Sequence, residues 1–159
     1  MVLLIGCSSD SVDSSDETPV IIETGLKDLA TSKGKFIGNL MRDGFFDNHD
    51  IYNGAIDNIL KTEYNALVTG NKLKMVNLLR DRPEDPFNIK ISDLNTYNID
   101  RFVNYANKHN MKKRGHVMIW YKQIPNWLDE ESKTWTSQQI YDFTESYIRA
   151  LSRYTIGTV

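Results

Sequence analysis

The chain has 159 residues, of which 40% are hydrophobic and 25% are charged, and its formal net charge is −2 at pH 7. This composition is typical of a folded globular protein, and the near balance of acidic and basic residues argues against nucleic acid as a partner. No apolar run is long enough to span a bilayer. Three scattered histidines and a single cysteine indicate neither a metal site nor a disulfide framework, and no cofactor is expected.

The N-terminal segment differs in composition from the rest of the chain. It opens MVLLIGCSSDSVDSSDETP, in which residues 4–7 resemble a bacterial lipoprotein lipobox with Cys7 as the acylated residue. Ser and Asp dominate the following stretch, which is expected to be solvated. We therefore predict a signal remnant and disordered tether over residues 1–25, a folded domain over residues 26–159, and a lipid anchor at the bacterial cell surface. A frayed polar terminus with an incidental cysteine is the alternative, because no basic residues precede the apolar stretch.

After residue 25, strand-like runs alternate with segments of helical periodicity. Strands are predicted at 35–40, 64–68 and 114–120, with a fourth beginning at 154–159. Helices are predicted at 51–62, at 98–110 and from Thr136 onward, where Thr136 and Gln139 form a capping box. Their apolar faces are Tyr52, Ala55, Ile56, Ile59 and Leu60 in the first, Ile99, Phe102, Val103 and Ala106 in the second, and Ile140, Phe143, Tyr147, Ile148 and Leu151 in the third.

This alternation predicts an α/β fold with a parallel sheet and helices packed outside it. No glycine-rich phosphate loop follows the first strand, which disfavours nucleotide-binding versions of the architecture. The remaining common choice is a (β/α)₈ TIM barrel, which needs roughly 250 residues. We therefore expect only the first three β/α units of such a barrel and the start of strand 4.

Barrel enzymes carry their functional side chains at the C-terminal ends of the strands. The second predicted strand leads into Asn71 and Lys74, and the third leads through Trp120 into Gln123. Strand alternation places His116 on the face of Trp120, and we expect that face to point into the barrel mouth. An aromatic platform flanked by amide, amine and imidazole groups suits a sugar, which presents apolar ring faces and hydroxyls.

Each of these residues also has an ordinary structural interpretation. A histidine inside an apolar strand is commonly a satisfied core residue, and Trp120 and Trp127 are equally well interpreted as packing residues. Asn71 and Lys74 are typical of a solvated loop. Only the combination carries a functional prediction.

Two segments together resemble one enzyme family. Residues 64–75, YNALVTGNKLKM, are similar to the F-N-x-x-T-x-E-N-x-M-K-W segment of family 10 glycoside hydrolases, the endo-xylanases. Residues 100–127, DRFVNYANKHNMKKRGHVMIWYKQIPNW, are similar to that family's A-D-x-x-V-x-F-A-x-x-N-x-M-x-x-R-G-H-x-L-x-W-H-x-Q-x-P-x-W. The resemblance extends over residues 26–159 at consistent spacing.

The resemblance implies a (β/α)₈ barrel that hydrolyses β-1,4-xylan with retention of configuration, with xylan or a xylo-oligosaccharide as the partner. By matching position, it implies that His116, Lys74 and Trp120 line the glycone subsite next to the scissile bond. It also implies that Asn71 and Gln123 bind hydroxyls there or one subsite further out.

Two departures fall inside the motifs. The family's glutamate is Gly70 here, which removes an acceptor for a substrate hydroxyl and predicts altered glycone binding. The family's second histidine is Tyr121, which by strand alternation should face away from the substrate.

A third departure concerns catalysis. Retaining hydrolysis needs two carboxyl groups about 5–5.5 Å apart, but the family's W-D-V-x-N-E motif is absent and no carboxylate here matches either catalytic position. Glu130 and Glu131 are expected in a surface loop. We therefore predict no turnover by this chain alone and completion by the C-terminal half of the barrel.

Three interpretations compete. The leading one is a portion of a surface-tethered endo-xylanase that carries glycone-subsite residues but neither catalytic glutamate. The second is a non-catalytic xylan-binding surface lipoprotein, which Gly70 and Tyr121 favour. The third is an unstable product of an interrupted gene without function.

Overall fold

Residues 24–42, 44–45 and 54–156 are described by the computed structural model, and in them three parallel strands are ordered β1-β2-β3. The expected tether and Cys7 lie outside these residues. The strands are β1 (Gly38–Met41), β2 (Ala66–Thr69) and β3 (Lys112–Arg114); the helices are α1 (Leu26–Ser32), α2 (Ala55–Glu63), α3 (Met75–Leu78), α4 (Tyr97–Lys108), α5 (Asn126–Glu131) and α6 (Ser137–Ile156), with 3₁₀ turns η1 (Ile91–Asp93) and η2 (Ser132–Thr134).

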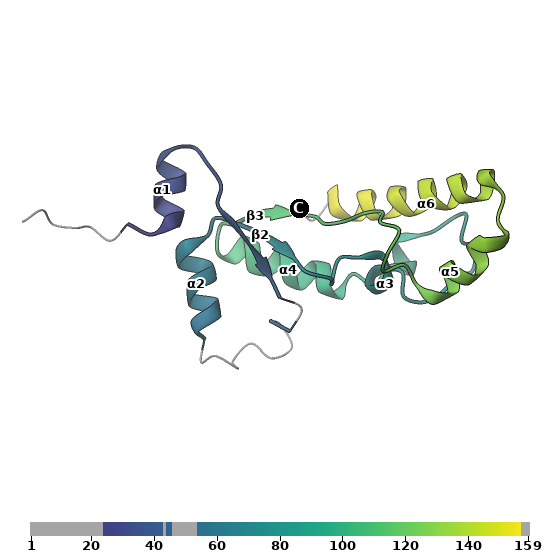
Figure 1. Cartoon of the computed structure of the whole chain (residues 1–159), viewed down its shortest axis with the longest axis horizontal. Helices are drawn as coiled ribbons and strands as arrows, with labels where there is room; N and C mark the ends of the chain where they lie inside the picture. Colours follow the sequence, from purple (N-terminus) through teal and green to yellow (C-terminus); the bar gives the residue numbers. More distant parts are fainter. Residues whose placement is uncertain (1–23, 43, 46–53, 157–159) are drawn as a thin grey trace, which may run out of the picture.

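The helices lie beside the sheet and extend past the carboxyl ends of its strands. Helix α4 contacts β2 and β3, α1 contacts α2, and α5 and α6 lie beyond the ends of the strands (Figure 1). Within the described part of the chain, no helix has the length and apolar composition needed to cross a lipid bilayer. The predicted parallel sheet with outer helices is confirmed.

Buried Asn65, which directly precedes β2, joins the sheet to α1. Its side-chain oxygen accepts the Ile37 N–H at 2.8 Å, and its amide donates to the Lys35 carbonyl at 3.2 Å and to Thr31 Oγ1 at 3.1 Å. Its backbone carbonyl accepts the Lys112 N–H at 2.8 Å. One residue therefore fixes where all three strands begin relative to one another.

Replacing Asn65 with alanine removes three side-chain hydrogen bonds and leaves the Ile37 N–H and the Lys35 carbonyl without this partner. We expect the free energy of unfolding to fall by about 3 kcal/mol, since each such bond contributes about 1 kcal/mol. Urea unfolding followed by circular dichroism measures the change. The matched control is Asn88→Ala at an exposed position, where we expect a change within about 0.5 kcal/mol; equal effects of the two variants would contradict this role.

The two longer helices follow their sequence patterns. In α4, Ile99, Phe102, Val103 and Ala106 are all buried, as predicted. Before α6, the Thr136 N–H donates to Gln139 Oε1 at 2.9 Å and the Gln139 N–H donates to Thr136 Oγ1 at 3.3 Å, which confirms the capping box. The buried face of α6 includes Ala150 rather than Ile140 and Ile148, which are exposed.

The third strand is shorter than predicted. The prediction of a strand over residues 114–120 was wrong, because β3 pairs with β2 only from Lys112↔Ala66 to Arg114↔Val68. Strand β2 ends at Thr69, so the backbone that follows Arg114 has almost no neighbour to pair with. Residues 115–120 accordingly have no regular secondary structure.

The predicted start of a fourth strand was also wrong where it is described. Tyr154 to Ile156 form the last turn of α6, and residues 157–159 lie outside the described residues. The Tyr154 hydroxyl donates to Asp100 of α4, and Thr155 Oγ1 donates to the Leu151 carbonyl at 3.0 Å. Both contacts fit a continuing helix that packs on α4.

Helix α2 is the least buried of the predicted helices. Of its expected apolar face, Leu60 is buried while Ile59 is half exposed, and Tyr52 lies outside the described residues. Asp57 anchors the helix, because it accepts the Tyr105 hydroxyl of α4 at 2.8 Å and forms an ion pair with Lys61 at 3.0 Å. Burial alone raises the pKa of Asp57, but these hydrogen bonds outweigh it and hold that pKa below its ordinary value.

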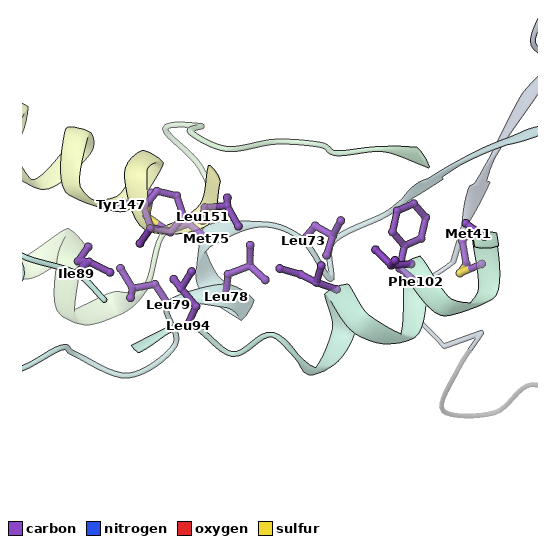
Figure 2. Close-up of a cluster of buried hydrophobic side chains, with 14 of the residues drawn as sticks. Met41, Leu73, Met75, Leu78, Leu79, Ile89, Leu94, Phe102, Tyr147 and Leu151 are labelled. Carbon is purple, nitrogen blue, oxygen red and sulfur yellow. The ribbon is translucent and has the colours of Figure 1, made fainter. Parts of the chain in front are cut away.

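The buried apolar side chains form one elongated cluster. It runs from Met41 of β1, past Phe102 of α4 and Leu73, to Tyr147 and Leu151 of α6 (Figure 2). Leu73, in the loop between β2 and α3, is itself part of this cluster. The site residues of that loop therefore rest on a packed core.

Candidate functional site

The loop from β2 to α3 holds Asn71 and Lys74 in one compact turn. The backbone carbonyl of Asn71 accepts the Lys74 N–H at 2.9 Å and the side-chain amide of Asn77 at 2.9 Å. The Gly70 N–H donates to the Met41 carbonyl at 3.1 Å, which ties the start of this loop to the end of β1. Hydrogen bonds therefore fix this turn both at its start and at its end.

The segment from β3 to α5 is fastened to the same loop. The Val76 N–H, in the first turn of α3, donates to the Gln123 carbonyl at 2.9 Å. Further along, the Trp127 indole donates to the Leu79 carbonyl at 3.3 Å. These two bonds hold residues 120–127 against α3, although the segment belongs to no strand.

Lys74 joins the two segments through its side chain. Its ammonium donates to Asn71 Oδ1 at 2.8 Å and lies 4.7 Å from the centroid of the Trp120 ring. An ammonium has three protons to donate, and an indole presents a broad apolar face. We call Asn71, Lys74 and Trp120 the Lys74 cluster; it combines an amide, a cation and an aromatic face, which suits a ring compound that bears hydroxyls.

Gln123 joins this arrangement mainly through its backbone. Its carbonyl accepts the Val76 N–H, whereas its side chain is exposed. Its backbone φ is 55°, which lies in the left-handed region. A non-glycine residue in that region is uncommon and is maintained by its surroundings. Gln123 therefore shapes the segment that presents Trp120.

His116 belongs to the irregular segment that follows β3. With Val117 and Met118 it lines an apolar hollow of about 380 Å³ between α4 and α6. Because residues 115–120 form no strand, strand alternation does not place His116, and its role in the glycone subsite stays a prediction. The structure brings together Asn71, Lys74, Trp120 and the backbone of Gln123.

The expected surface-loop carboxylates belong to a helix. Glu130 and Glu131 form the end of α5, which begins after Pro125 and was not predicted. Glu130 forms an ion pair with Lys133 at 2.7 Å and Glu131 with Arg82 at 2.6 Å. Both carboxylates are therefore engaged in ion pairs at the surface.

Sequence reasoning missed Asn77 as a supporting residue of the site. The only signal for it was an asparagine inside the otherwise apolar turn MVNL. It also missed the bond between Val76 and Gln123, for which the sequence carries no signal because both groups are backbone atoms. The sequence singled out Asn71, Lys74 and Trp120, but not the hydrogen bonds that position them.

Replacing Asn77 with alanine removes one of the two donors to the Asn71 carbonyl. We expect amide hydrogen exchange at Lys74 to become about fivefold faster, because about 1 kcal/mol of local stabilisation is lost. Exchange measured by NMR at neutral pH gives the rate. In the control Asn58→Ala, on the exposed side of α2, the Lys74 rate should stay at its wild-type value, and an unchanged rate in the Asn77 variant would show that the bond does not hold the turn.

Comparison with known proteins places this geometry in context. A family profile described as "Glycosyl hydrolase family 10" matches residues 25–158. Endo-1,4-beta-xylanase B of Thermotoga neapolitana is 25% identical over 162 residues, which cover all of this chain and 40% of that protein. The chain thus spans well under half the length of this relative.

Two solved structures show the same fold. Native xylanase 10B from Thermotoga maritima superposes with a TM-score of 0.70 at 20% identity, covering 85% of this chain and 38% of the other. Xylanase 10B from Thermotoga petrophila RKU-1, in complex with xylobiose, superposes with a TM-score of 0.62 at 22% identity, covering 80% and 35%. These structures are TIM barrels, and the parallel sheet with its helices corresponds to part of one.

Proposed function

Since the chain belongs to glycosyl hydrolase family 10, we propose that it carries glycone-side residues of a retaining, endo-1,4-beta-xylanase-like hydrolase that degrades xylan. The proposal draws on the printed activity of a relative, which is an endo-1,4-beta-xylanase, and on a solved neighbour in complex with xylobiose. The ligand proposed for this chain is therefore a xylo-oligosaccharide or a xylan chain.

The observation that carries this proposal is the position of Lys74 between Asn71 and Trp120. The ammonium lies 2.8 Å from the amide oxygen and 4.7 Å from the indole centroid, so a sugar on this surface meets a donor and an aromatic face together. Trp120 is 37% exposed, which leaves part of its ring accessible. Sugar hydroxyls pair with amide and ammonium groups, and the apolar face of a sugar ring packs on an indole.

Affinity electrophoresis in gels that contain soluble xylan tests the proposal. We expect xylan to retard the wild-type chain, and Lys74→Ala or Trp120→Ala to weaken retention about tenfold, as expected for a loss of about 1.4 kcal/mol. Lys133→Ala is the matched control, because Lys133 pairs with Asp129 and Glu130 on the surface of α5 and should not affect retention. Equal mobility of all four proteins with and without xylan would refute sugar binding by this chain.

We propose further that the two carboxyl groups of the reaction come from strands that complete the barrel around this sheet. On this account the chain by itself binds xylan but releases no reducing sugar, since retaining hydrolysis requires both carboxylates in place. The Lys74 cluster forms entirely within this chain, which keeps the alternative open as a second candidate: a non-catalytic xylan-binding surface lipoprotein. Reducing ends released by the purified chain would contradict both proposals.

We also propose extracytoplasmic attachment through a lipid on Cys7. This proposal rests on the sequence LIGC and on the polar stretch that follows it. In a bacterial host we expect incorporation of labelled fatty acid into the wild-type chain and recovery in the membrane fraction, and neither in Cys7→Ala. Labelling of the alanine variant, or a wild-type chain found only in the soluble fraction, would overturn the anchor.

A further inference from the structure

Next to Trp120 stands a second aromatic ring that the proposed site does not use. The ring centroids of Trp120 and Tyr121 lie 5.9 Å apart, and the ring planes meet at 81°. Tyr121 is 76% exposed, more than any other large hydrophobic or aromatic side chain described except Ile156. Strand alternation predicted that Tyr121 faces away from the substrate, but the segment is irregular and places the two rings in contact.

Each ring of this pair has a lysine beside it. Lys74 Nζ lies 4.7 Å from the Trp120 centroid, and Lys122 Nζ lies 5.3 Å from the Tyr121 centroid. The two rings therefore form a corner, with one ammonium donor on each. Tyr121 with Lys122 repeats, one residue along the chain, the pairing of a ring with a cation that Trp120 and Lys74 provide.

We propose that Tyr121 and Lys122 form a second sugar-binding platform, which takes the xylose unit next to the one on Trp120. This inference rests on the proposed function and extends it by one sugar unit. An exposed phenol ring gains free energy when an apolar sugar face covers it, and the Lys122 ammonium donates to a hydroxyl of the same unit. Consecutive rings in a β-1,4-linked xylan chain are rotated relative to one another, so two rings at a steep angle suit neighbouring units better than one flat surface.

The test compares ligands of different length on the intact chain. Ligand-observed NMR titrations give the Kd for xylotetraose and for methyl β-D-xyloside, which presents a single ring. We expect Tyr121→Ala to weaken xylotetraose binding about fivefold, as expected for the loss of about 1 kcal/mol of ring burial, and to leave the methyl xyloside Kd unchanged. Tyr121→Phe should behave as wild type, because the ring face rather than the hydroxyl makes the contact.

Tyr141 supplies a matched control. It is 62% exposed on α6, and Tyr141→Ala should leave both Kd values unchanged. Equal xylotetraose affinity of wild type and Tyr121→Ala would overturn the inference, and so would an equal loss for both ligands, because Tyr121 would then act only by positioning Trp120. A wild-type chain that binds neither ligand would instead refute the proposed function and this inference with it.

Discussion

The structure depends first on the buried side chain of Asn65. A buried amide is tolerated only when its donors and acceptors are paired, and here the pairs run to the backbone before β1 and to α1, while the carbonyl of the same residue receives the N–H at the start of β3. The three strands therefore start in a fixed register. Parallel strands that start in register deliver their following loops to the same edge of the sheet.

That edge is where the candidate site assembles. The Gly70 N–H donates to the Met41 carbonyl at the end of β1, and the Asn77 side-chain amide donates to the Asn71 carbonyl. The Val76 N–H donates to the carbonyl of Gln123, in the segment after β3. The Gly70 and Val76 bonds join backbone atoms, so they do not use the side chains that point outward. Lys74 then connects the two loops through a hydrogen bond and a cation–π contact.

The parts of this structure that sequence alone predicted are those set by local patterns. The four apolar positions of α4 and the Thr136–Gln139 cap are local, and both were correct. The spacing of Trp120, Gln123 and Pro125 after His116 identified the family, which the profile match confirms. The α5 helix was missed because it is one short segment after a proline.

The end of β3 could not be predicted from its own residues. An apolar, β-branched run such as HVMIW favours a strand, but a strand continues only while a neighbour offers backbone partners, and β2 stops at Thr69. The wrong strand end removed the basis for placing the following side chains by strand alternation. His116 lines the hollow beside α4, and the Tyr121 ring lies against that of Trp120.

The most direct test of the central claim is a backbone amide NMR titration of the wild-type chain with xylotetraose. If the Lys74 cluster binds sugar, the largest shifts should appear at Asn71, at Lys74 and at the Trp120 indole N–H, and they should saturate together with one Kd. Shifts confined to the residues around the His116 hollow, or no saturable shifts at any sugar concentration, would contradict the account.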